Sequence, residues 1–218
     1  MKNLVVAIDG PAGAGKSTVA QLAAKKLGYT YIDTGAMYRA VAWKTLQQKK
    51  DVTDELILEV VKDIDVDLQY KDGKATVAVD GTDVTGEIRT PEVSAIVSQV
   101  AALGPVREKM VDLQRKMGER GSVLMDGRDI ATNVLPNADV KIFLTASIEE
   151  RARRRHKELT EKGYTIDMEQ MKADIAARDK ADSEREISPL VQAEDATLLD
   201  TTGLSIDEVV ERILSMCK

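Results

Sequence analysis

Residues 4–17 read Leu4-Val5-Val6-Ala7-Ile8-Asp9-Gly10-Pro11-Ala12-Gly13-Ala14-Gly15-Lys16-Ser17. The last eight residues match the motif G-x-x-x-x-G-K-[ST], and a helical pattern over Ser17–Leu27, closed by Gly28, follows them. In this motif the glycines let the backbone turn so that successive N–H groups point inward. They do so at a helix N-terminus, where the helix dipole also favours negative charge. The sequence therefore predicts a buried strand, a phosphate-binding loop (Gly10–Ser17) and a helix.

Three polar side chains at the end of this loop suit the same chemistry. Lys16 can reach the β- and γ-phosphates of a nucleotide, and the Ser17 hydroxyl can ligate Mg²⁺. Thr18 adds a hydroxyl within reach of the α-phosphate. We expect Lys16 to be an exposed loop lysine that supports no core. The alternative is a glycine-rich turn that merely joins a strand to a helix, but the strand before it and the helix after it favour nucleotide binding.

Short apolar runs recur along the rest of the chain, separated by helical patterns. The predicted strands are Leu4–Ile8, Thr30–Asp33, Val123–Asp126, Val140–Leu144 and Thr197–Asp200. Most of these runs lack polar alternation, as expected of strands that are buried on both faces of a parallel sheet. Because strands alternate with helices, the sequence predicts a doubly wound α/β fold around a five-stranded parallel sheet.

The helices are predicted from apolar spacing and from capping residues. The shorter ones are Ser17–Leu27, Ala36–Gln47, Asp54–Asp63 with Asp54 as its N-cap, and Ile206–Met216. Another helix begins at Thr90-Pro91, where a capping threonine precedes a proline suited to the first turn. It breaks near Gly104-Pro105 and restarts. Long charged helices follow from about Ser147.

Residues 64–86 depart from this alternation of strands and helices. Three short strand patterns are separated by two Asp-Gly pairs, in the order Ile64–Tyr70, Asp72-Gly73, Thr76–Val79, Asp80-Gly81, Thr82–Thr85. Asp-Gly between alternating strands is a strong hairpin signal, so we predict a three-stranded antiparallel insert at the edge of the core. A decorated surface loop is the alternative. The chain then divides into a core, residues 1–63 and 87–218, and this insert.

Composition excludes several classes of protein. With 31 Lys and Arg against 37 Asp and Glu the formal charge is −6, which argues against a nucleic-acid polymer as partner. No apolar run approaches the roughly 20 residues that a membrane helix needs, so no membrane partner is expected. The only cysteine, Cys217, cannot form an internal disulfide, and this fits a reducing cytoplasm. We expect a cytoplasmic monomer.

The phosphate-binding loop alone does not separate switches, motors and kinases. The tetrapeptide Asn-Lys-x-Asp, which GTPases use to bind guanine, does not occur. Motors and polynucleotide ATPases are generally larger, and this chain lacks a basic face. A small-molecule kinase remains, with a non-catalytic nucleotide-binding protein as the alternative.

A kinase needs a pocket for its acceptor, and arginines near strand ends mark one. Arg39 lies in Asp33-Thr34-Gly35-Ala36-Met37-Tyr38-Arg39, after the second strand, and Arg128 lies in Asp126-Gly127-Arg128-Asp129, after the third. The carboxyl ends of strands are where α/β proteins bind ligands. Further along, Arg178, Asp182 and Arg185 are spaced by about one helical turn, which predicts that they share a helix face.

Together these motifs resemble those of the bacterial cytidylate kinase family. The resemblance includes Ser98-Gln99-Val100-Ala101 and Val106-Arg107-Glu108 and runs nearly end to end. It implies transfer of the γ-phosphoryl group of ATP to CMP or dCMP with Mg²⁺, and an insert within the monophosphate-binding region. It also implies a short helical lid at about residues 151–167. Another monophosphate kinase, acting on UMP or AMP, and a nucleotide sensor remain the alternatives.

The resemblance also implies a role for individual residues. Lys16, Asp126, Arg128 and Arg185 would be catalytic, with Asp126 orienting Mg²⁺ through water. The residues of the CMP site would be Thr34 (where some members have serine), Tyr38, Arg39, Ser98, Arg107, Arg128, Asp129, Arg178, Asp182 and Arg185. Of these, Arg39, Arg128 and Arg185 would hold the phosphate. Ser98, Arg107 and Asp129 would read the cytosine, and Arg178 and Asp182 would contact the ribose. In the lid, Arg151 would stack on adenine and Arg155 would approach the phosphates of ATP.

Overall fold

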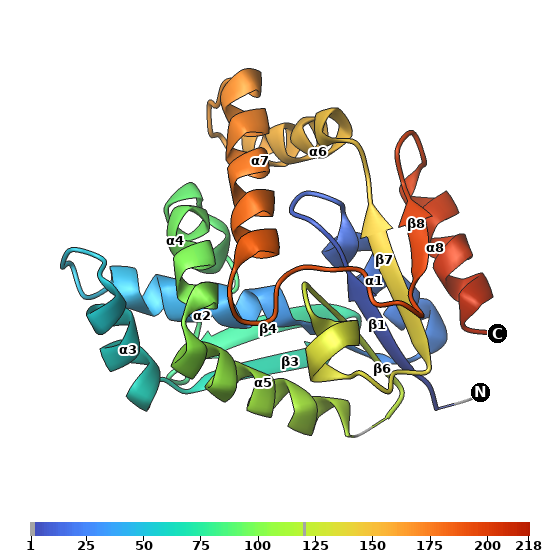
Figure 1. The fold of residues 1–218 in the computed structure, drawn as a ribbon, viewed down its shortest axis with the longest axis horizontal. Helices are drawn as coiled ribbons and strands as arrows, with labels where there is room; N and C mark the ends of the chain where they lie inside the picture. Colours follow the sequence, from blue (N-terminus) through green and yellow to red (C-terminus); the bar gives the residue numbers. More distant parts are fainter. Residues whose placement is uncertain (1–2, 120) are drawn as a thin grey trace.

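The computed structural model describes residues 3–119 and 121–218, which form two β-sheets surrounded by helices (Figure 1). The larger sheet is parallel, with its five strands in the order β2-β6-β1-β7-β8. These strands are β1 (Val5–Asp9), β2 (Thr30–Asp33), β6 (Val123–Gly127), β7 (Val140–Thr145) and β8 (Thr197–Asp200). Each agrees with its predicted range to within one residue at either end, and the doubly wound α/β fold is confirmed.

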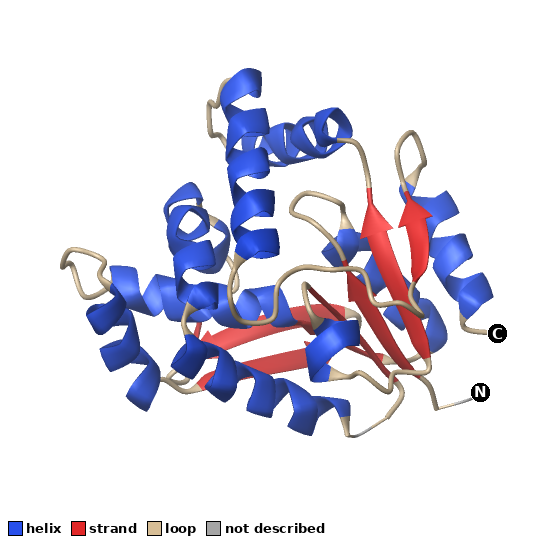
Figure 2. Cartoon of the chain, viewed as in Figure 1, coloured by secondary structure: helices blue, strands red, loops and turns tan. Residues whose placement is uncertain are grey.

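Helices cover both faces of this sheet (Figures 1 and 2). On one face, α1 (Lys16–Leu27) and α8 (Ile206–Met216) bury Ile8 of β1. On the other face, the π-helical turn η2 (Ile130–Val134) and α5 (Gly104–Gly118) bury Ala7 of the same strand. Successive residues of a strand point to opposite faces, so β1 contributes to both cores and is apolar from Val5 to Ile8.

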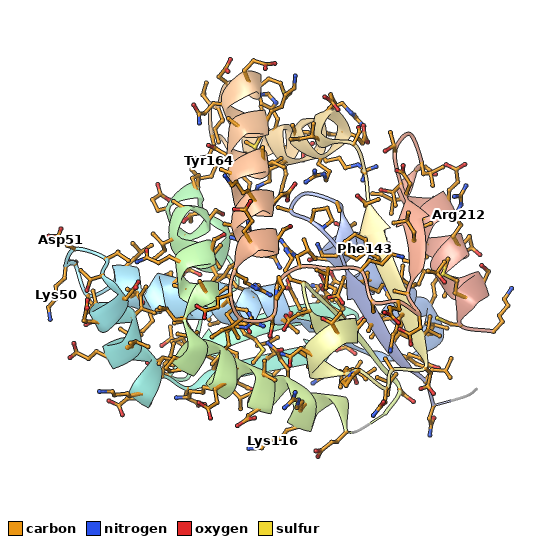
Figure 3. The ribbon with its side chains drawn as sticks, in the orientation of Figure 1. Lys50, Asp51, Lys116, Phe143, Tyr164 and Arg212 are labelled. Carbon is orange, nitrogen blue, oxygen red and sulfur yellow. The ribbon has the colours of Figure 1, made fainter. Side chains whose placement is uncertain are left out.

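Aliphatic side chains fill these cores because the chain is poor in aromatic residues. Its single phenylalanine, Phe143, lies partly buried on β7 (Figure 3).

Among the residues that the structure describes, no helix is both long enough and apolar enough to cross a membrane.

The register of the sheet brings the carboxyl ends of three strands together. Ile8 of β1 lies beside Asp126 of β6, and Asp33 of β2 lies on the other side of Asp126. The chain leaves β1 directly into the loop Gly10–Ser17. Neighbouring parallel strands whose connections run to opposite sides leave a crevice at their carboxyl ends. The fold therefore places this loop next to the residues that follow β2 and β6.

The remaining helices mostly follow the predicted pattern. They are α2 (Thr34–Leu46), α3 (Asp54–Asp63), the 3₁₀ turn η1 (Glu87–Arg89), α4 (Pro91–Ala102), α6 (Ile148–Glu161) and α7 (Met168–Glu184). The predicted break between α4 and α5 occurs at Leu103, which is extended. Two details of the prediction are wrong. The N-cap of α3 is Thr53, whose hydroxyl accepts the Leu56 N–H at 3.3 Å, and not Asp54. Arg185 is the extended C-cap of α7, so it does not share a helix face with Arg178.

The insert is a three-stranded antiparallel sheet, as predicted, and not a surface loop. Its strands are β3 (Val66–Lys71), β4 (Lys74–Val79) and β5 (Thr82–Asp83). Both residues of each Asp-Gly turn have φ between 50° and 77°, the conformation that a tight hairpin requires. Val66, Val77 and Val79 are buried in the same core as α2 and α4, so one face of the insert is part of the protein interior.

Candidate active site

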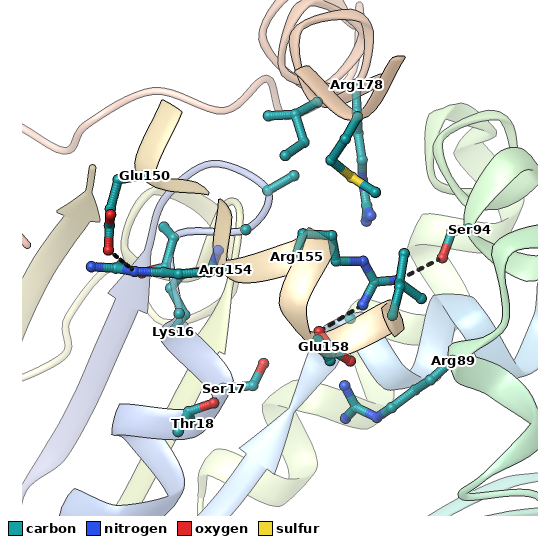
Figure 4. Close-up of a pocket in the computed structure, with 18 of the residues that line it drawn as sticks. Lys16, Ser17, Thr18, Arg89, Ser94, Glu150, Arg154, Arg155, Glu158 and Arg178 are labelled. Atoms are coloured by element: carbon teal, nitrogen blue, oxygen red, sulfur yellow. Dashed lines mark hydrogen bonds and ion pairs between the residues drawn. The ribbon is translucent and has the colours of Figure 1, made fainter. Parts of the chain in front are cut away.

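A cavity of about 1060 Å³ lies above the carboxyl ends of β1, β2 and β6. The loop after β1 lines one wall, and α4 lines the opposite wall. Residues of α6 and α7 and the segment 201–209 complete it. Figure 4 shows Lys16, Ser17 and Thr18 on one side of the cavity, Ser94 on the other, and Arg178 directed into it from α7. The predicted site residues Ala12–Thr18, Arg39, Ser98, Asp126, Arg128, Arg155 and Arg178 all line this cavity.

Lys16 is buried, with 5% of its surface exposed, so the expectation of an exposed loop lysine is wrong. Its ammonium group donates to the carbonyl oxygens of Gly10 and Pro11, at 2.7 and 2.8 Å. These bonds hold the side chain under its own loop. Burial lowers the pKa of Lys16, and the charge of Arg128 lowers it further. An anion bound in the loop would offset both effects, which is what the phosphates of a nucleotide supply.

Packing against β7 requires a glycine at position 10, a requirement that the motif alone does not reveal. The φ of Gly10 is 150°, and a Cβ at this position would stand 1.9 Å from the carbonyl oxygen of Leu144 on β7. Only a residue without a side chain lets the strands β1 and β7 approach this closely.

Ser17 and Asp126 bring oxygen atoms together beneath the loop. The Ser17 hydroxyl donates to Asp126 Oδ2 at 3.2 Å, and the Tyr31 hydroxyl donates to Asp126 Oδ1 at 2.7 Å. Burial raises the pKa of Asp126, and the Asp33 carboxylate raises it further. A divalent cation here would lower this cost, and oxygen atoms are the ligands that Mg²⁺ prefers. The described residues contain no group of three or more His, Cys, Asp or Glu that could hold a metal.

Four of the arginines that line the cavity, Arg39, Arg128, Arg155 and Arg178, come from different segments of the chain. Arg39 of α2 donates to Ser94 Oγ at 2.9 Å, and Arg128 donates to Asp182 of α7 at 2.8 Å. Burial lowers the pKa of Arg39, and so do the charges of Arg178 and Arg155. Burial also lowers the pKa of Arg178, to about 10. Several half-buried cations this close together repel one another unless an anion lies between them, so the arrangement favours a phosphorylated ligand.

Two of the three residues predicted to read the base, Arg107 and Asp129, lie together beside the cavity, whereas Ser98 lines it. Arg107 and Asp129 form a buried ion pair, and the Arg107 guanidinium lies 5.6 Å from the centre of the Tyr38 ring. Arg185 approaches the other oxygen of Asp129 at 3.5 Å. Arg107 Nε finds no hydrogen-bond partner among the described residues. Thr34 lies nearby with its hydroxyl bonded to the Asp126 carbonyl oxygen at 2.8 Å.

The turn that follows Asp129 is held from two sides. The Asp9 carboxylate accepts the N–H groups of Ile130 and Ala131, both at 2.8 Å. Arg115 of α5 donates to the carbonyl oxygen of Asn133 at 2.8 Å. Burial raises the pKa of Asp9 to about 6, although the two N–H groups act in the opposite direction. Asp9 directly precedes Gly10, so one residue links the loop to the turn that carries Asp129.

The arginines of α6 differ in where they point. Arg151 is 7% exposed and donates to the Ala12 carbonyl oxygen at 2.9 Å and to Asp179 at 2.5 Å. It therefore lies against the phosphate-binding loop and outside the cavity lining. Arg155 faces the cavity and donates to Ser94 Oγ at 3.3 Å (Figure 4).

The cavity lining also contains residues that the sequence-based prediction did not name, among them Arg89, Ser94 and Arg154. Arg154 donates to the Ala14 carbonyl oxygen at 3.1 Å, and Arg89 pairs with Asp33 at 2.7 Å. Ser94 connects Arg39 and Arg155. The arginine-rich run of α6 was a signal for Arg154. Arg89 and Ser94 lie at or near an ordinary helix start and carry no such signal.

Comparisons with known proteins agree with this architecture. Residues 6–218 match the family model for cytidylate kinase. Proteins named cytidylate kinase from Bacillus cereus and Bacillus thuringiensis are each 55% identical to the chain over 216 residues, covering 99% of it and 96% of each relative. A solved structure of an uncharacterized protein from Eubacterium ventriosum shares the fold, with a TM-score of 0.55 at 12% identity over 98% of this chain and 97% of that one. The chain belongs to the cytidylate kinase family.

Proposed function

We propose that this protein transfers the γ-phosphoryl group of ATP to CMP or dCMP and releases ADP with CDP or dCDP. The observation that carries the proposal is a set of cations that converge on one cavity beside the buried Arg107–Asp129 pair: the buried Lys16 and the half-buried Arg39, Arg128, Arg155 and Arg178. Membership of the cytidylate kinase family, with named relatives at 55% identity, supports the choice of substrate.

On the donor side, the backbone N–H groups of the loop Gly10–Ser17 would bind the phosphates of ATP. Lys16, whose ammonium donates to two loop carbonyl groups in this structure, would add a positive charge at the transferred group. Ser17 directly, and Asp126 through water, would hold Mg²⁺, which when bound neutralises charge on the β- and γ-phosphates. Thr18 would contact the α-phosphate, and Arg155 would approach the other phosphates from α6.

On the acceptor side, Arg39, Arg128 and Arg185 would hold the CMP phosphate in line with the transferred group. That phosphate is already an anion, so no residue has to remove a proton from it. Catalysis then consists of positioning and of charge neutralisation by Lys16 and the arginines. Arg178 and Asp182 would contact the sugar, and Asp182 also fixes Arg128 at 2.8 Å.

Cytosine recognition would depend on hydrogen-bond polarity. Cytosine presents an amino donor at N4 and acceptors at N3 and O2, whereas uracil presents an acceptor at O4 and a donor at N3. Asp129 and Ser98 can accept from N4, and Arg107 can only donate, toward N3 and O2. The same groups would meet uracil with acceptor against acceptor and donor against donor. Such a mismatch disfavours UMP by roughly a hundredfold to ten-thousandfold.

Two segments would close around the substrates. We assign the lid to residues 151–167 and the insert, residues 64–86, to the monophosphate-binding region, the rest of the chain being the kinase core. Their closure would exclude water that otherwise hydrolyses ATP. We also expect the protein to act as a cytoplasmic monomer on free nucleotides and not on nucleic acid or membranes.

A coupled assay of ADP release tests the function directly. Wild-type protein is given ATP and Mg²⁺ with CMP, dCMP, UMP or AMP in turn, and kcat/KM is measured for each. We expect CMP and dCMP to be used best, by at least a hundredfold over UMP. A preference for UMP or AMP would identify a different monophosphate kinase. Nucleotide binding without acceptor-dependent ADP release would identify a sensor.

A further inference from the structure

Tyr31 on β2 contacts the carboxylate that the proposed function places nearest to Mg²⁺. Its side chain is buried, and its hydroxyl donates to Asp126 Oδ1 at 2.7 Å. The other oxygen, Oδ2, accepts from Ser17 at 3.2 Å. The two oxygens of Asp126 are therefore distinguished: one faces Tyr31 and the other faces the phosphate-binding loop. An aspartate without such a partner can rotate about its terminal torsion, which is broad.

The Tyr31 ring is itself fixed by the insert. Tyr70 of β3 packs edge to face against it, with ring centres 5.9 Å apart and an angle of 76° between the planes. Tyr70 donates to the Gln21 carbonyl oxygen at 3.4 Å, and the Gln21 side chain donates to the Gly73 carbonyl oxygen at 2.9 Å. Gln21 lies on α1, the helix that begins at Lys16. The first hairpin of the insert is thus fastened both to Tyr31 and to the helix of the phosphate-binding loop.

We propose that Tyr31 is a positioning residue that orients Asp126 toward the Ser17 side of the site, and that Tyr70 holds it there. The inference rests on the proposed function only where that function assigns Asp126 to Mg²⁺. Groups that orient a metal-binding carboxylate typically contribute ten- to hundredfold to metal affinity. The insert would then support the magnesium side of the site as well as the monophosphate side.

The test uses equilibrium binding, so it does not require turnover. The affinity of the protein for ATP is measured with Mg²⁺ and with excess EDTA, and the ratio of the two Kd values gives the contribution of Mg²⁺. We expect Tyr31→Phe, which keeps the ring and removes the hydroxyl, to reduce this ratio about tenfold and to leave the EDTA affinity unchanged. Tyr29→Phe is the matched control, because its hydroxyl accepts the Leu4 N–H and lies outside the site. It should retain the wild-type ratio.

Two further variants separate positioning from general support of the fold. In an Asp126→Ala background, Tyr31→Phe should cause no further loss of the ratio, because the carboxylate that it orients is gone. Tyr70→Leu, which removes the edge-to-face contact, should also reduce the ratio, whereas Tyr70→Phe should reduce it much less. Thermal unfolding of each variant identifies any loss that is due to misfolding.

The ratio of Kd values tests the role of Tyr31 whether or not the protein phosphorylates CMP. A wild-type ratio in Tyr31→Phe, or an equal loss with and without the Asp126 carboxylate, would overturn it. ATP affinity that is insensitive to Mg²⁺ in the wild type would overturn it too. If the protein binds ATP with Mg²⁺ but does not phosphorylate CMP, the proposed function fails and the ratio still decides the role of Tyr31.

Discussion

Arg107 and Asp129 neutralise each other inside the protein, where only 3% and 4% of their surfaces are exposed. Both are assigned to the cytosine edge, and neither lines the open cavity. The pair has a stacking partner in Tyr38 and a second cation in Arg185. If the two residues read the base as proposed, their charges compensate each other without a nucleotide. A base would then have to offer each of them a hydrogen bond of the correct polarity, which would favour selectivity for cytosine.

Asp129→Ala should lower kcat/KM for CMP much more than for UMP, because it removes the acceptor for the N4 amino group. Arg107→Met should also weaken CMP use and relax the preference further, because it removes the donor that opposes the N3–H of uracil. The measurement is kcat/KM for both substrates in the wild type and in each variant. Equal proportional losses for CMP and UMP would mean that these residues do not read the base.

The same variants should affect stability in a recognisable pattern. Asp129→Ala leaves Arg107 and Arg185 buried without their carboxylate, and breaking such a pair costs about 3–5 kcal/mol of unfolding free energy. Arg107→Met combined with Asp129→Ala should recover part of that loss. Urea unfolding measures this. An additive double variant would contradict the coupling that the ion pair predicts.

Lys16→Ala should lower kcat on the order of a hundredfold, the scale of losing one preorganised contact to the transferred group. Because Lys16 is buried and bonded to two loop carbonyl groups, Lys16→Met, which keeps most of the stem, is the better matched variant. It should show the same loss in kcat. Lys50→Ala, an exposed lysine in the turn after α2 (Figure 3), is the control. Turnover near the wild-type value in Lys16→Met would exclude the charge from catalysis.

Replacing residues 64–85 with a short Gly/Ser linker should raise the KM for CMP. It should also lower the free energy of unfolding by several kcal/mol, because Val66, Val77 and Val79 are buried against the core and each contributes about 1.5–3 kcal/mol. ATP binding with excess EDTA should stay nearly intact. If that binding collapses while the KM for CMP holds, the insert belongs to the donor side alone.

Asp9 should make the protein less stable as the pH rises through the weakly acidic range. Its pKa is about 6 in the folded protein against an ordinary value of 3.8, so between these values the folded state binds more protons than the unfolded state. The free energy of unfolding therefore falls with rising pH, by up to about 3 kcal/mol in total. In Asp9→Asn this component should disappear. Urea unfolding of both proteins between pH 4 and 7 gives the difference between their free energies of unfolding. The prediction requires this difference to change with pH, because a constant difference would reflect something other than the titration of Asp9.

The parts of the molecule that sequence predicts well are those with local causes. Buried parallel strands are rich in apolar residues, and Asp-Gly turns favour a positive φ, so strands such as Val123–Gly127 and the hairpins follow from their own residues. The N-cap of α3 was misassigned by one residue because Thr53 and Asp54 are both capping types. Pairings between distant segments leave no local trace. The contact of Tyr31 with Asp126, across 95 positions, follows from the register of β2 and β6 and not from either motif.

The burial of charged side chains could likewise not be predicted from the sequence. Lys16 is covered because its ammonium folds back onto the loop, and Arg151 is covered because α7 supplies Asp179. Their residue types are those of exposed cations. Arg185 was expected on a helix face, yet α7 ends one residue earlier and the backbone turns it toward Asp129.

The contact between Gly10 and Leu144 changes how a mutational survey of the loop has to be interpreted. A methyl group at position 10 would act as a wedge between two central strands, since it would overlap the Leu144 carbonyl oxygen. Variants at this position would therefore be scored as inactive for reasons of assembly, whatever they do to phosphate. Loss of function on substitution of Gly10 therefore reports on the packing of the loop against β7. Phosphate chemistry is better tested at Lys16, where a substitution does not force the two strands apart.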